Sequence, residues 1–328
     1  MPDTPCDPLA AAGWGTMAGE EVAMTGTTMH DDERDIDAGL VRRLLAAQLP
    51  QWAGLPLTPV RSAGTDNAMF RLGDDMAVRL PRVPWAVEQV AKEQTWLPRL
   101  APLLPLAVPE LLGTGAPGAG YDWPWSVYRW LDGVDATVEP VADLHRAADE
   151  LGGFVAALRR VDPTGGPPPG EHNSGRGVPL AARDTATRAA ITSLVGMIDT
   201  DAATAAWEAA LRAPVWDGPP AWIHGDLHAA NLLVRQGELS AVIDFGCLGV
   251  GDPAGDVSAA WVFCSAGTRD TFRAAAQPDD AMWARGRGWA LSPALIALPY
   301  YRTSNPVLAG IARRAIDEVL ADREHAAG

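Results

Sequence analysis

A polar loop held between two short apolar runs constrains the fold of this 328-residue chain more than any other feature. The apolar runs are residues 221–223 and 232–234, and the loop between them holds His224, Asp226 and Asn231. Short apolar runs that are bounded by turn residues are typical of buried strands. We therefore expect the protein core to fix both ends of the loop and to hold its polar side chains in place.

A second polar turn follows the next apolar run, where residues 241–243 lead into the tripeptide Asp-Phe-Gly that begins at Asp244. Asp226 and Asn231 are five residues apart, and this spacing followed by Asp-Phe-Gly is the pattern of a kinase catalytic loop. Phosphoryl transfer needs a carboxylate beside the acceptor hydroxyl, and it needs oxygen ligands that hold Mg²⁺ against the phosphates. The pattern predicts Asp226 as the base and Asn231 and Asp244 as the Mg²⁺ ligands.

The first third of the chain has the pattern of a small antiparallel sheet. Alternating apolar residues and turn residues predict strands at 57–62, 68–72, 76–80, 108–113 and 125–130. Helical spacing of apolar residues predicts helices at 36–49 and 86–103. We expect residues 31–131 to form a nucleotide-binding N-lobe. Residues 1–30 show no clear periodicity, and we expect them to form a flexible N-terminal extension.

Beyond residue 131 the pattern becomes mainly helical. Helices are expected at 141–160, 180–197 and 201–212, and again after Pro253. A cluster of Pro and Gly at 162–179 indicates a loop or an insertion. A strand-rich part followed by a helical part predicts an α+β, bilobal, protein-kinase-like fold with a small antiparallel-sheet N-lobe. Residues 132–328 then form a larger, mainly helical C-lobe for catalysis and acceptor binding.

The net charge of the chain restricts the kinds of molecule that it is expected to bind. Lys and Arg total 26 against 41 Asp and Glu, which gives a net charge of -15. Nucleic-acid binding needs clustered basic surface, so we expect no nucleic-acid partner, whereas a cationic small molecule would be attracted. No apolar run reaches the roughly 18 residues of a membrane span, and no secretory signal is evident. The three cysteines form no disulfide framework, so the sequence favours a cytoplasmic protein that does not bind membranes.

Further motifs extend the pattern around the polar loop. From about Val60 to about Trp261 they include the run 224–228, the segment 243–246 and the tripeptide Gly-Asp-Pro at 251–253. On these motifs the chain resembles the aminoglycoside phosphotransferase family of antibiotic kinases, which have the protein-kinase-like fold. The resemblance implies ATP or GTP as the phosphoryl donor, Mg²⁺, and a hydroxyl group of a small molecule as the acceptor.

The resemblance also implies roles for three residues around the base. Asp256 completes a Gly-Asp-Pro-x-x-Asp pattern, and we expect it to brace the catalytic loop as a structural residue. His224 occupies the position that supports the loop of kinases by hydrogen bonding. His228 is expected to brace the loop or to face solvent, with contact to the substrate as the alternative.

In the first lobe the resemblance predicts a phosphate-covering loop between the first two strands, with a plain hairpin turn as the alternative. The residues of this loop are Ser62, Gly64, Thr65, Asp66 and Asn67. The joint between the lobes is expected to meet the purine of the nucleotide at Tyr128, Arg129 and Trp130.

The third strand departs from the kinase pattern at the residue that binds phosphate. Kinases have a lysine there, paired with a glutamate of the following helix, whereas this chain has Arg79. Glu93 is the expected partner, and Glu88 is the alternative. Arginine keeps its charge and can bind phosphate in a bidentate way, so we expect Arg79 to replace the lysine. Lys92 is next to Glu93 on the helix, is expected to face elsewhere and is a poor substitute.

The sequence restricts the identity of the acceptor molecule less than it restricts the type of reaction. An acidic helical lobe would attract an aminoglycoside, a polycation with many hydroxyl groups, and we expect such an antibiotic as the leading acceptor. Related loops occur in kinases of macrolides, choline-like amines, homoserine and sugars, which remain alternatives. The acidic residues considered for this contact, each of which could equally be a solvated surface charge, are Asp149, Glu150, Asp162, Glu171, Asp199 and Asp201.

Two functions of other classes compete with the kinase. His224, Asp226 and His228 could be ligands of a metal-dependent hydrolase, although such sites usually need more ligands. The arginine on the third strand could instead mark an inactive nucleotide-binding protein. The presence of Asp226, Asn231 and Asp244 argues against that alternative.

Overall fold

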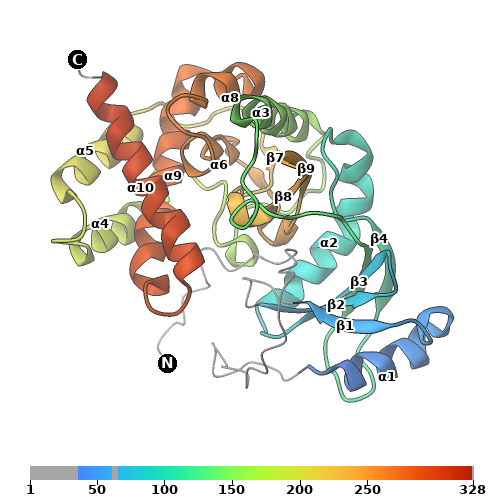
Figure 1. The fold of residues 1–328 in the computed structure, drawn as a ribbon. Coiled ribbons are helices and arrows are strands. Elements are labelled where there is room, and N and C mark those ends of the chain that lie inside the picture. The colour runs from blue at the N-terminus through green and yellow to red at the C-terminus, as the bar shows by residue number, and fades with distance from the viewer. Residues whose placement is uncertain (1–35, 61–65, 327–328) are drawn as a thin grey trace. The chain divides into compact units, whose positions relative to one another are not determined.

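The computed structural model describes residues 36–60 and 66–326, which form two compact units (Figure 1). The sheet unit holds the described residues up to Pro140 together with Ala230–Gly246. The helical unit holds Val141–Ala229 and the residues from Cys247 onward. The chain therefore passes from the helical unit to the sheet unit and back again within the stretch that carries the predicted site.

The lobe boundaries predicted from the sequence stay a prediction. The extension predicted at residues 1–30 lies outside the described part of the chain. The C-lobe predicted to begin at residue 132 would include the segment 230–246, which the contacts join to the sheet unit.

The sheet unit contains a five-stranded antiparallel sheet in the order β1-β2-β3-β5-β4. Its strands are β1 (Leu57–Val60), β2 (Asn67–Leu72), β3 (Met76–Pro81), β4 (Leu111–Gly115) and β5 (Trp125–Arg129). A second sheet in this unit has the order β6-β8-β9, with β6 (Val134–Asp135), β8 (Leu232–Arg235) and β9 (Glu238–Val242). The Val242 amide donates to the Ala107 carbonyl at 2.9 Å, which ties the β8–β9 hairpin to the segment before β4.

Two helices accompany the five-stranded sheet, α1 (Ala38–Gln48) and α2 (Ala86–Leu100). The Asp37 side chain caps α1 by accepting a hydrogen bond from a backbone amide of the first turn at 2.6 Å, which fixes where this helix begins. Leu44 of α1 is fully buried in one cluster with Val78 and Trp125 of the sheet. The apolar spacing that predicts this helix therefore supplies one side of the core.

The helical unit is built from paired helices and one short sheet. Figure 1 shows α3 beside α8 and α9 beside α10, and both pairs are in extensive contact. The helices are α3 (Leu144–Arg160), α4 (Asp184–Ser193), α5 (Thr200–Leu211), α6 (Ala254–Val257), α7 (Ala259–Val262), α8 (Arg269–Ala276), α9 (Asp280–Tyr301) and α10 (Pro306–Ala326). The short sheet pairs β7 (Ala221–Ile223) with β10 (Gly249–Gly251). The predicted α+β fold, with a small antiparallel sheet and a mainly helical remainder, is confirmed.

Short 3-10 turns complete the secondary structure of the described residues. They are Pro50–Trp52, Ala101–Leu103, Glu171–Asn173, Leu180–Arg183, Ala229–Asn231 and Phe245–Cys247.

Among the predicted elements that begin later than expected, two do so for a clear local reason. The helix expected from Val141 begins at Leu144, because Asp143 accepts hydrogen bonds from two backbone amides of the first turn, both at 3.0 Å. The strand expected to include Pro109 begins only at Leu111, because proline has no N–H to donate to a strand ladder.

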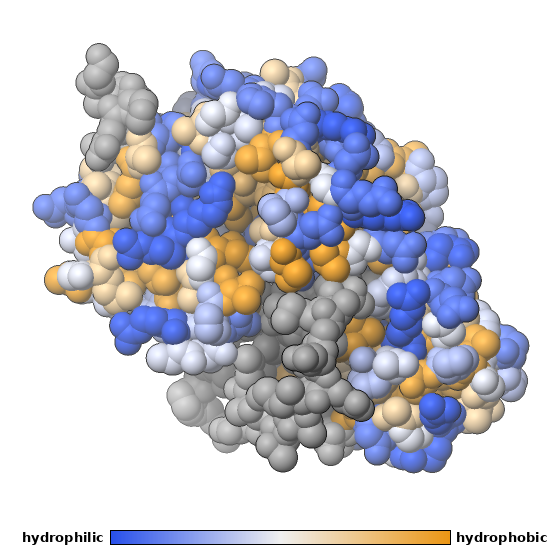
Figure 2. All heavy atoms as spheres, viewed as in Figure 1, coloured by the Kyte–Doolittle hydropathy of each residue, from blue (hydrophilic) through white to orange (hydrophobic). Residues whose placement is uncertain are grey.

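Both hydrophilic and hydrophobic residues are present on the surface of the protein. Figure 2 shows hydrophilic and hydrophobic residues interspersed over the visible face. Among the described residues, none of the helices is both long enough and apolar enough to cross a membrane.

Candidate active site

The loop that carries Asp226 follows β7 and is fixed by the backbone around it. β7 pairs with β10, and its central residue Trp222 is buried. The chain turns at Gly225, whose φ of 83° lies in the left-handed region that favours glycine. A Cβ atom there would lie 2.8 Å from the carbonyl oxygen of Cys247. The turn that leads to Asp226 therefore requires this glycine.

Asp256 of α6 holds this turn in place. Its two carboxylate oxygens accept hydrogen bonds from the amides of His224 and Gly225, both at 2.7 Å. Burial raises the pKa of Asp256 to about 7, although the two amide hydrogen bonds favour the ionised form. His224 adds a second contact, because its Nδ1 accepts a hydrogen bond from the Asp226 amide at 3.2 Å. Both side chains therefore act on the backbone of the loop.

Two nitrogen-bearing side chains surround the carboxylate of Asp226. Arg176 donates from Nε to the Gly225 carbonyl at 2.7 Å, and its Nη2 lies 3.6 Å from Asp226 Oδ1. His228 Nε2 lies 3.3 Å from Asp226 Oδ2. Burial by itself would raise the pKa of Asp226, but His228 and Arg176 outweigh burial and hold this pKa below its ordinary value. Asp226 is thus a buried carboxylate that stays ionised at neutral pH, which a base needs before it takes a proton.

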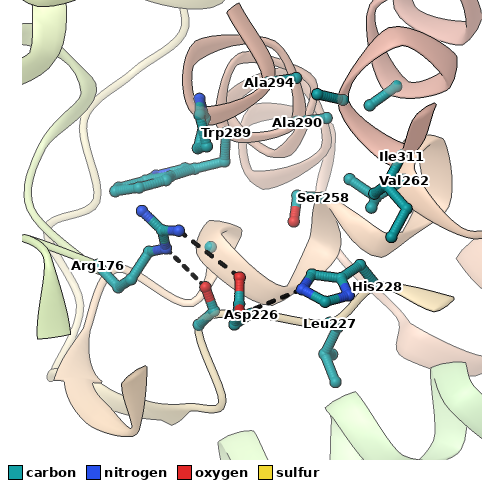
Figure 3. A pocket seen from close by; sticks show the side chains of 15 residues that line it. Arg176, Asp226, Leu227, His228, Ser258, Val262, Trp289, Ala290, Ala294 and Ile311 are labelled. Atoms are coloured by element: carbon teal, nitrogen blue, oxygen red, sulfur yellow. Dashed lines mark hydrogen bonds and ion pairs between the residues drawn. The ribbon is translucent and has the colours of Figure 1, made fainter. Parts of the chain in front are cut away.

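A small pocket opens beside Asp226. Its volume is about 40 Å³, more than the roughly 10–15 Å³ that a cavity needs to hold one water molecule. Figure 3 shows Arg176, Asp226 and His228 on one side of the pocket, and apolar residues of α7, α9 and α10, such as Ile311, on the other. Asp226 is the only carboxylate among the described residues that line this pocket. The pocket therefore has room for a hydroxyl group next to the base.

Asn231 and Asp244 lie at the two ends of the β8–β9 hairpin in the sheet unit. The Ile243 amide donates to the Asn231 carbonyl at 2.9 Å, so the two side chains start from adjacent backbone positions. Both residues are buried, and Asp244 has a left-handed φ of 62°. An amide oxygen and a carboxylate suit Mg²⁺, which takes one or two protein oxygens together with phosphate oxygens and water. The donor set of this hairpin therefore fits the ion that the sequence predicts.

Arg79 in β3 is the centre of a buried ion-pair network in the sheet unit. Its Nη1 donates to Glu93 Oε1 at 2.6 Å, and its Nη2 lies 3.5 Å from Asp244 Oδ1. The Tyr128 hydroxyl donates to Glu93 Oε2 at 2.9 Å. Burial would lower the pKa of Arg79, but Glu93 and Asp244 outweigh burial and raise it above its ordinary value. The partner of Arg79 is thus Glu93, and the alternative partner Glu88 is exposed.

Arg129 and Trp130, two of the three predicted hinge residues, have partners within the sheet unit. Arg129 Nε donates to Glu110 Oε2 at 2.5 Å, and the Arg71 guanidinium lies over the Trp130 ring with Cζ 4.2 Å from its centroid. The Trp130 amide donates to the Asp75 carbonyl at 2.7 Å. Contact of the hinge with a nucleotide stays a prediction.

The predicted phosphate-covering loop is described only at its end. Its residues Ser62, Gly64 and Thr65 lie outside the described part of the chain. Asp66 is buried, and its Oδ2 accepts a hydrogen bond from Trp85 Nε1 at 3.1 Å. Asn67 is the first residue of β2. A role of this loop in covering phosphate stays a prediction.

Comparison with known proteins identifies the family. The family model described as the phosphotransferase enzyme family matches residues 57–289, which is more than half of the chain. The chain belongs to this phosphotransferase family. The match spans Arg79, the loop around Asp226 and the brace Asp256, so the resemblance seen in the sequence is confirmed at the level of the family.

Solved structures of phosphotransferases have the same kinase-like fold. The GDP and kanamycin complex of APH(2")-IIIa has 18% identity and a TM-score of 0.66, covering 86% of this chain and 98% of that one. Macrolide 2'-phosphotransferase MphH from Brachybacterium faecium has 24% identity and a TM-score of 0.56, covering 85% and 97%. The streptomycin–ATP–APH(2")-IIa complex has 17% identity and a TM-score of 0.55, covering 83% and 93%. At these identities, the similarity establishes the fold of this chain and does not identify its substrates.

Arg176 contacts Asp226 in the candidate site, and the sequence alone does not predict this contact. It lies in the segment 162–179, whose Pro and Gly content indicates a plain loop, and no motif connects it to Asp226. The one local signal is its place between Gly175 and Gly177, which both have left-handed φ values and bring the arginine into the core.

Lys92 is a second residue whose contact the sequence alone does not predict. Its Nζ donates to the Gly246 carbonyl at 2.5 Å, whereas Glu93 contacts Arg79 of β3, so the two neighbouring side chains face different partners, as the helical spacing predicts. Lys92 is buried and thus holds the turn that follows Asp244. The helix α2 therefore presents Glu93 to β3 and its neighbour Lys92 to this turn.

Proposed function

We propose that the protein is a small-molecule kinase that transfers the γ-phosphoryl group of ATP or GTP to an acceptor hydroxyl. The observation that carries the proposal is the carboxylate of Asp226, which His228 and Arg176 keep ionised beside a pocket with room for a hydroxyl group. Similar solved structures contain GDP, ADP or ATP, so both donors stay within the proposal.

Asp226 is the base of the proposed reaction. Its carboxylate accepts the acceptor's O–H hydrogen bond and takes the proton as the hydroxyl oxygen bonds to the γ-phosphorus. The bond between the γ-phosphorus and the β–γ bridging oxygen breaks in the same displacement, and the nucleoside diphosphate leaves. Asp256 and His224 keep the loop backbone fixed, so the carboxylate meets the hydroxyl in one position.

The sheet unit contributes the groups that hold the donor. Asn231 and Asp244 would hold Mg²⁺, which neutralises phosphate charge when it is bound. Arg79 would contact the donor phosphates in place of the usual lysine, with Glu93 fixing its guanidinium plane.

The two functions of other classes have less support. Within residues 36–60 and 66–326, no group of three or more His, Cys, Asp and Glu side chains could hold a metal ion. The described part of the chain therefore offers no metal centre of a hydrolase at His224, Asp226 and His228. An inactive nucleotide-binding protein has no need of a carboxylate that is kept ionised beside a pocket.

An aminoglycoside acceptor stays a prediction that rests on the net charge. Several of the acidic residues considered for this contact have structural partners. Asp199 caps α5 by accepting from the Ala202 amide at 2.9 Å, and Glu150 accepts from Arg146 Nε at 2.8 Å. Glu171 is exposed and lines a cavity of the helical unit.

Nucleotide consumption with Mg²⁺ and a panel of acceptors tests the proposal. The panel contains aminoglycosides, macrolides, amino alcohols and sugars. Asp226→Ala should lower kcat at least about 100-fold, because the positioned base is lost. Asp217→Ala removes an exposed carboxylate and should leave kcat unchanged. Full turnover in Asp226→Ala would contradict the role of this residue, and zinc-dependent turnover without nucleotide would contradict the kinase itself.

A further inference from the structure

A large cavity in the helical unit shares a wall with the pocket of the base. Its volume is about 810 Å³, within the roughly 300–1,000 Å³ typical of sites for small molecules. The segment before α4, the start of α4 and the end of α9 line it, with Arg176 and Arg183 among the lining residues. Arg176 also lines the small pocket that contains Asp226. A molecule in the large cavity would therefore contact the same arginine that contacts the base.

Arg183 brings a second guanidinium group to this cavity. Its Nε donates to Ser292 Oγ at 2.9 Å, and its Cζ lies 5.1 Å from the centroid of the Trp289 ring. Among the described residues, no carboxylate lies within ion-pair distance of Arg183. The adjacent carboxylate, Asp184, accepts instead from Arg188 Nε at 2.9 Å and is not aimed at the cavity. The guanidinium of Arg183 is thus fixed in orientation but has no counter-ion within that part of the chain.

The environment of Arg183 is unfavourable for its charge. Burial lowers the pKa of Arg183 to about 9, and the neighbouring charge of Arg176 acts in the same direction. Glu171 is the only carboxylate among the described residues that line the cavity, and it is exposed. A negative group in the cavity would relieve both the desolvation and the repulsion between the two arginines.

We propose that Arg183 and Arg176 bind an oxyanion group of the acceptor, either a carboxylate or a phosphate. This inference rests on the proposed function, because it treats the cavity as the acceptor site. A guanidinium can hold either group with two parallel, charge-assisted hydrogen bonds. The acceptor is then a hydroxy acid or a hydroxyl-bearing phosphate ester, because two arginines repel a polycation.

The net charge of -15 does not prevent this binding. At physiological ionic strength, exposed charges are screened beyond a Debye length of about 8 Å. A bound oxyanion would touch the two arginines directly, so their local charge outweighs the screened field of distant carboxylates.

Binding of inorganic phosphate and of acetate tests the oxyanion site without any turnover. We would follow the Tm of the full chain at constant ionic strength, with saturating ADP and Mg²⁺ so that the sites for donor phosphates are filled. At least one of the two anions should raise Tm in a saturable way, and Arg183→Gln should abolish that rise. An equal rise in Arg183→Gln and the unmodified protein, or no rise with either anion, would overturn the proposal.

Two further variants keep this experiment interpretable. Arg188→Gln removes a half-exposed arginine of α4 that lies outside the lining of the cavity, and it should leave the rise unchanged. Arg183→Lys keeps the positive charge and should retain part of the rise, even if the glutamine variant fails to fold. A complete loss in Arg183→Lys together with a complete loss in Arg188→Gln would also contradict a specific site.

Matched acceptors then separate the two sources of the oxyanion. D-Gluconate is compared with D-sorbitol, and glycerol 3-phosphate with glycerol, because the two members of each pair have the same open carbon chain and differ mainly in the oxyanion. The kcat/KM of the anionic member should be at least about tenfold higher in one pair, and Arg183→Gln should remove this preference through KM. Equal kcat/KM within both pairs would contradict the proposal. A Tm rise that persists in Asp226→Ala, without turnover of any acceptor by the unmodified protein, would support the oxyanion site and contradict the kinase.

Discussion

The sheet unit and the helical unit both bury charged side chains, but they surround them differently. In the sheet unit, Arg79 makes a short ion pair with Glu93, at 2.6 Å between Nη1 and Oε1. In the helical unit, Asp226 has longer contacts, 3.6 Å to Arg176 and 3.3 Å to His228. The first arrangement joins opposite charges directly, whereas the second surrounds one carboxylate with two nitrogen-bearing side chains at longer distances.

The difference shows that position and charge state are controlled by separate contacts. Glu93 and Asp244 raise the pKa of Arg79 against the effect of burial, so this network fixes a permanent cation in one place. The groups around Asp226 lower its pKa, again against the effect of burial, so this arrangement keeps a base ready to take a proton. The position of Asp226 is left to Asp256, which holds the backbone and not the carboxylate.

Arg79→Met removes the cation of the buried network in the sheet unit, and among the substitutions in the two units we expect it to lower the free energy of unfolding most. It leaves Glu93 buried without its cation, and removing one partner of a buried ion pair costs about 3–5 kcal/mol. We expect the free energy of unfolding, measured by urea denaturation, to fall by about this amount. Arg79→Lys keeps a positive charge near Glu93 and should lose clearly less.

An exposed pair of the same sheet provides the matched control for Arg79. Arg129 and Glu110 are both about half exposed, at 46% and 56% of their side chains, and such pairs contribute only about 0–1 kcal/mol. Arg129→Met should therefore change the free energy of unfolding by about 1 kcal/mol or less. Similar losses in Arg79→Met and Arg129→Met would mean that the buried network does not fix the unit.

Asp256→Asn should weaken the helical-unit arrangement by a smaller amount. An amide offers one acceptor oxygen in place of two, so one of the amides of His224 and Gly225 is left without its partner, at a cost of about 1–3 kcal/mol. The free energy of unfolding should be measured at pH 8, above the pKa of about 7, so that Asp256 is ionised. Asp270→Asn, at an exposed position of α8, is the control. An unchanged stability would show that relief of the buried charge offsets the lost hydrogen bond.

The sequence predicts those parts of the site that one short stretch of chain holds together. Asp226, Asn231 and Asp244 stand at fixed spacings because a single loop and a single hairpin carry them, so residue types and spacing suffice. The strands of the sheet are equally local, since each follows from its own alternation of apolar residues. The contact of Arg176 with Asp226 is different, because it joins distant positions and depends on how a Pro- and Gly-rich segment packs.

The helix α2 shows which contacts a local sequence pattern predicts and which contacts depend on the tertiary fold. Helical spacing correctly separates the face of Lys92 from the face of Glu93. It cannot tell what each face meets, because that depends on where the β8–β9 hairpin returns to the unit. Lys92 therefore contacts Gly246 although the sequence alone assigns it no role at the site.

Arg176→Gln should have the smallest effect of these substitutions. It tests whether charged neighbours in the helical unit set the pKa of Asp226. Burial raises the pKa of Asp226, and Arg176 is one of the groups that offset burial, so the pKa should rise when its charge is removed. A carboxylate base works only when it is ionised, so activity is present above its pKa and is lost as pH falls through it. The acidic limb of the kcat/KM profile should therefore move to higher pH.

The pH profile of kcat/KM distinguishes an electrostatic role of Arg176 from a purely positioning role. Glutamine can still donate a hydrogen bond to the Gly225 carbonyl, so the loop keeps a partner while the positive charge is gone. Arg188→Gln, which removes a charge outside the pocket, should leave the acidic limb in place. If Arg176→Gln lowers the plateau but does not move the acidic limb, then Arg176 only positions the loop. The helical unit would then differ from the sheet unit in geometry alone, and the pKa of Asp226 would be set by His228 and burial.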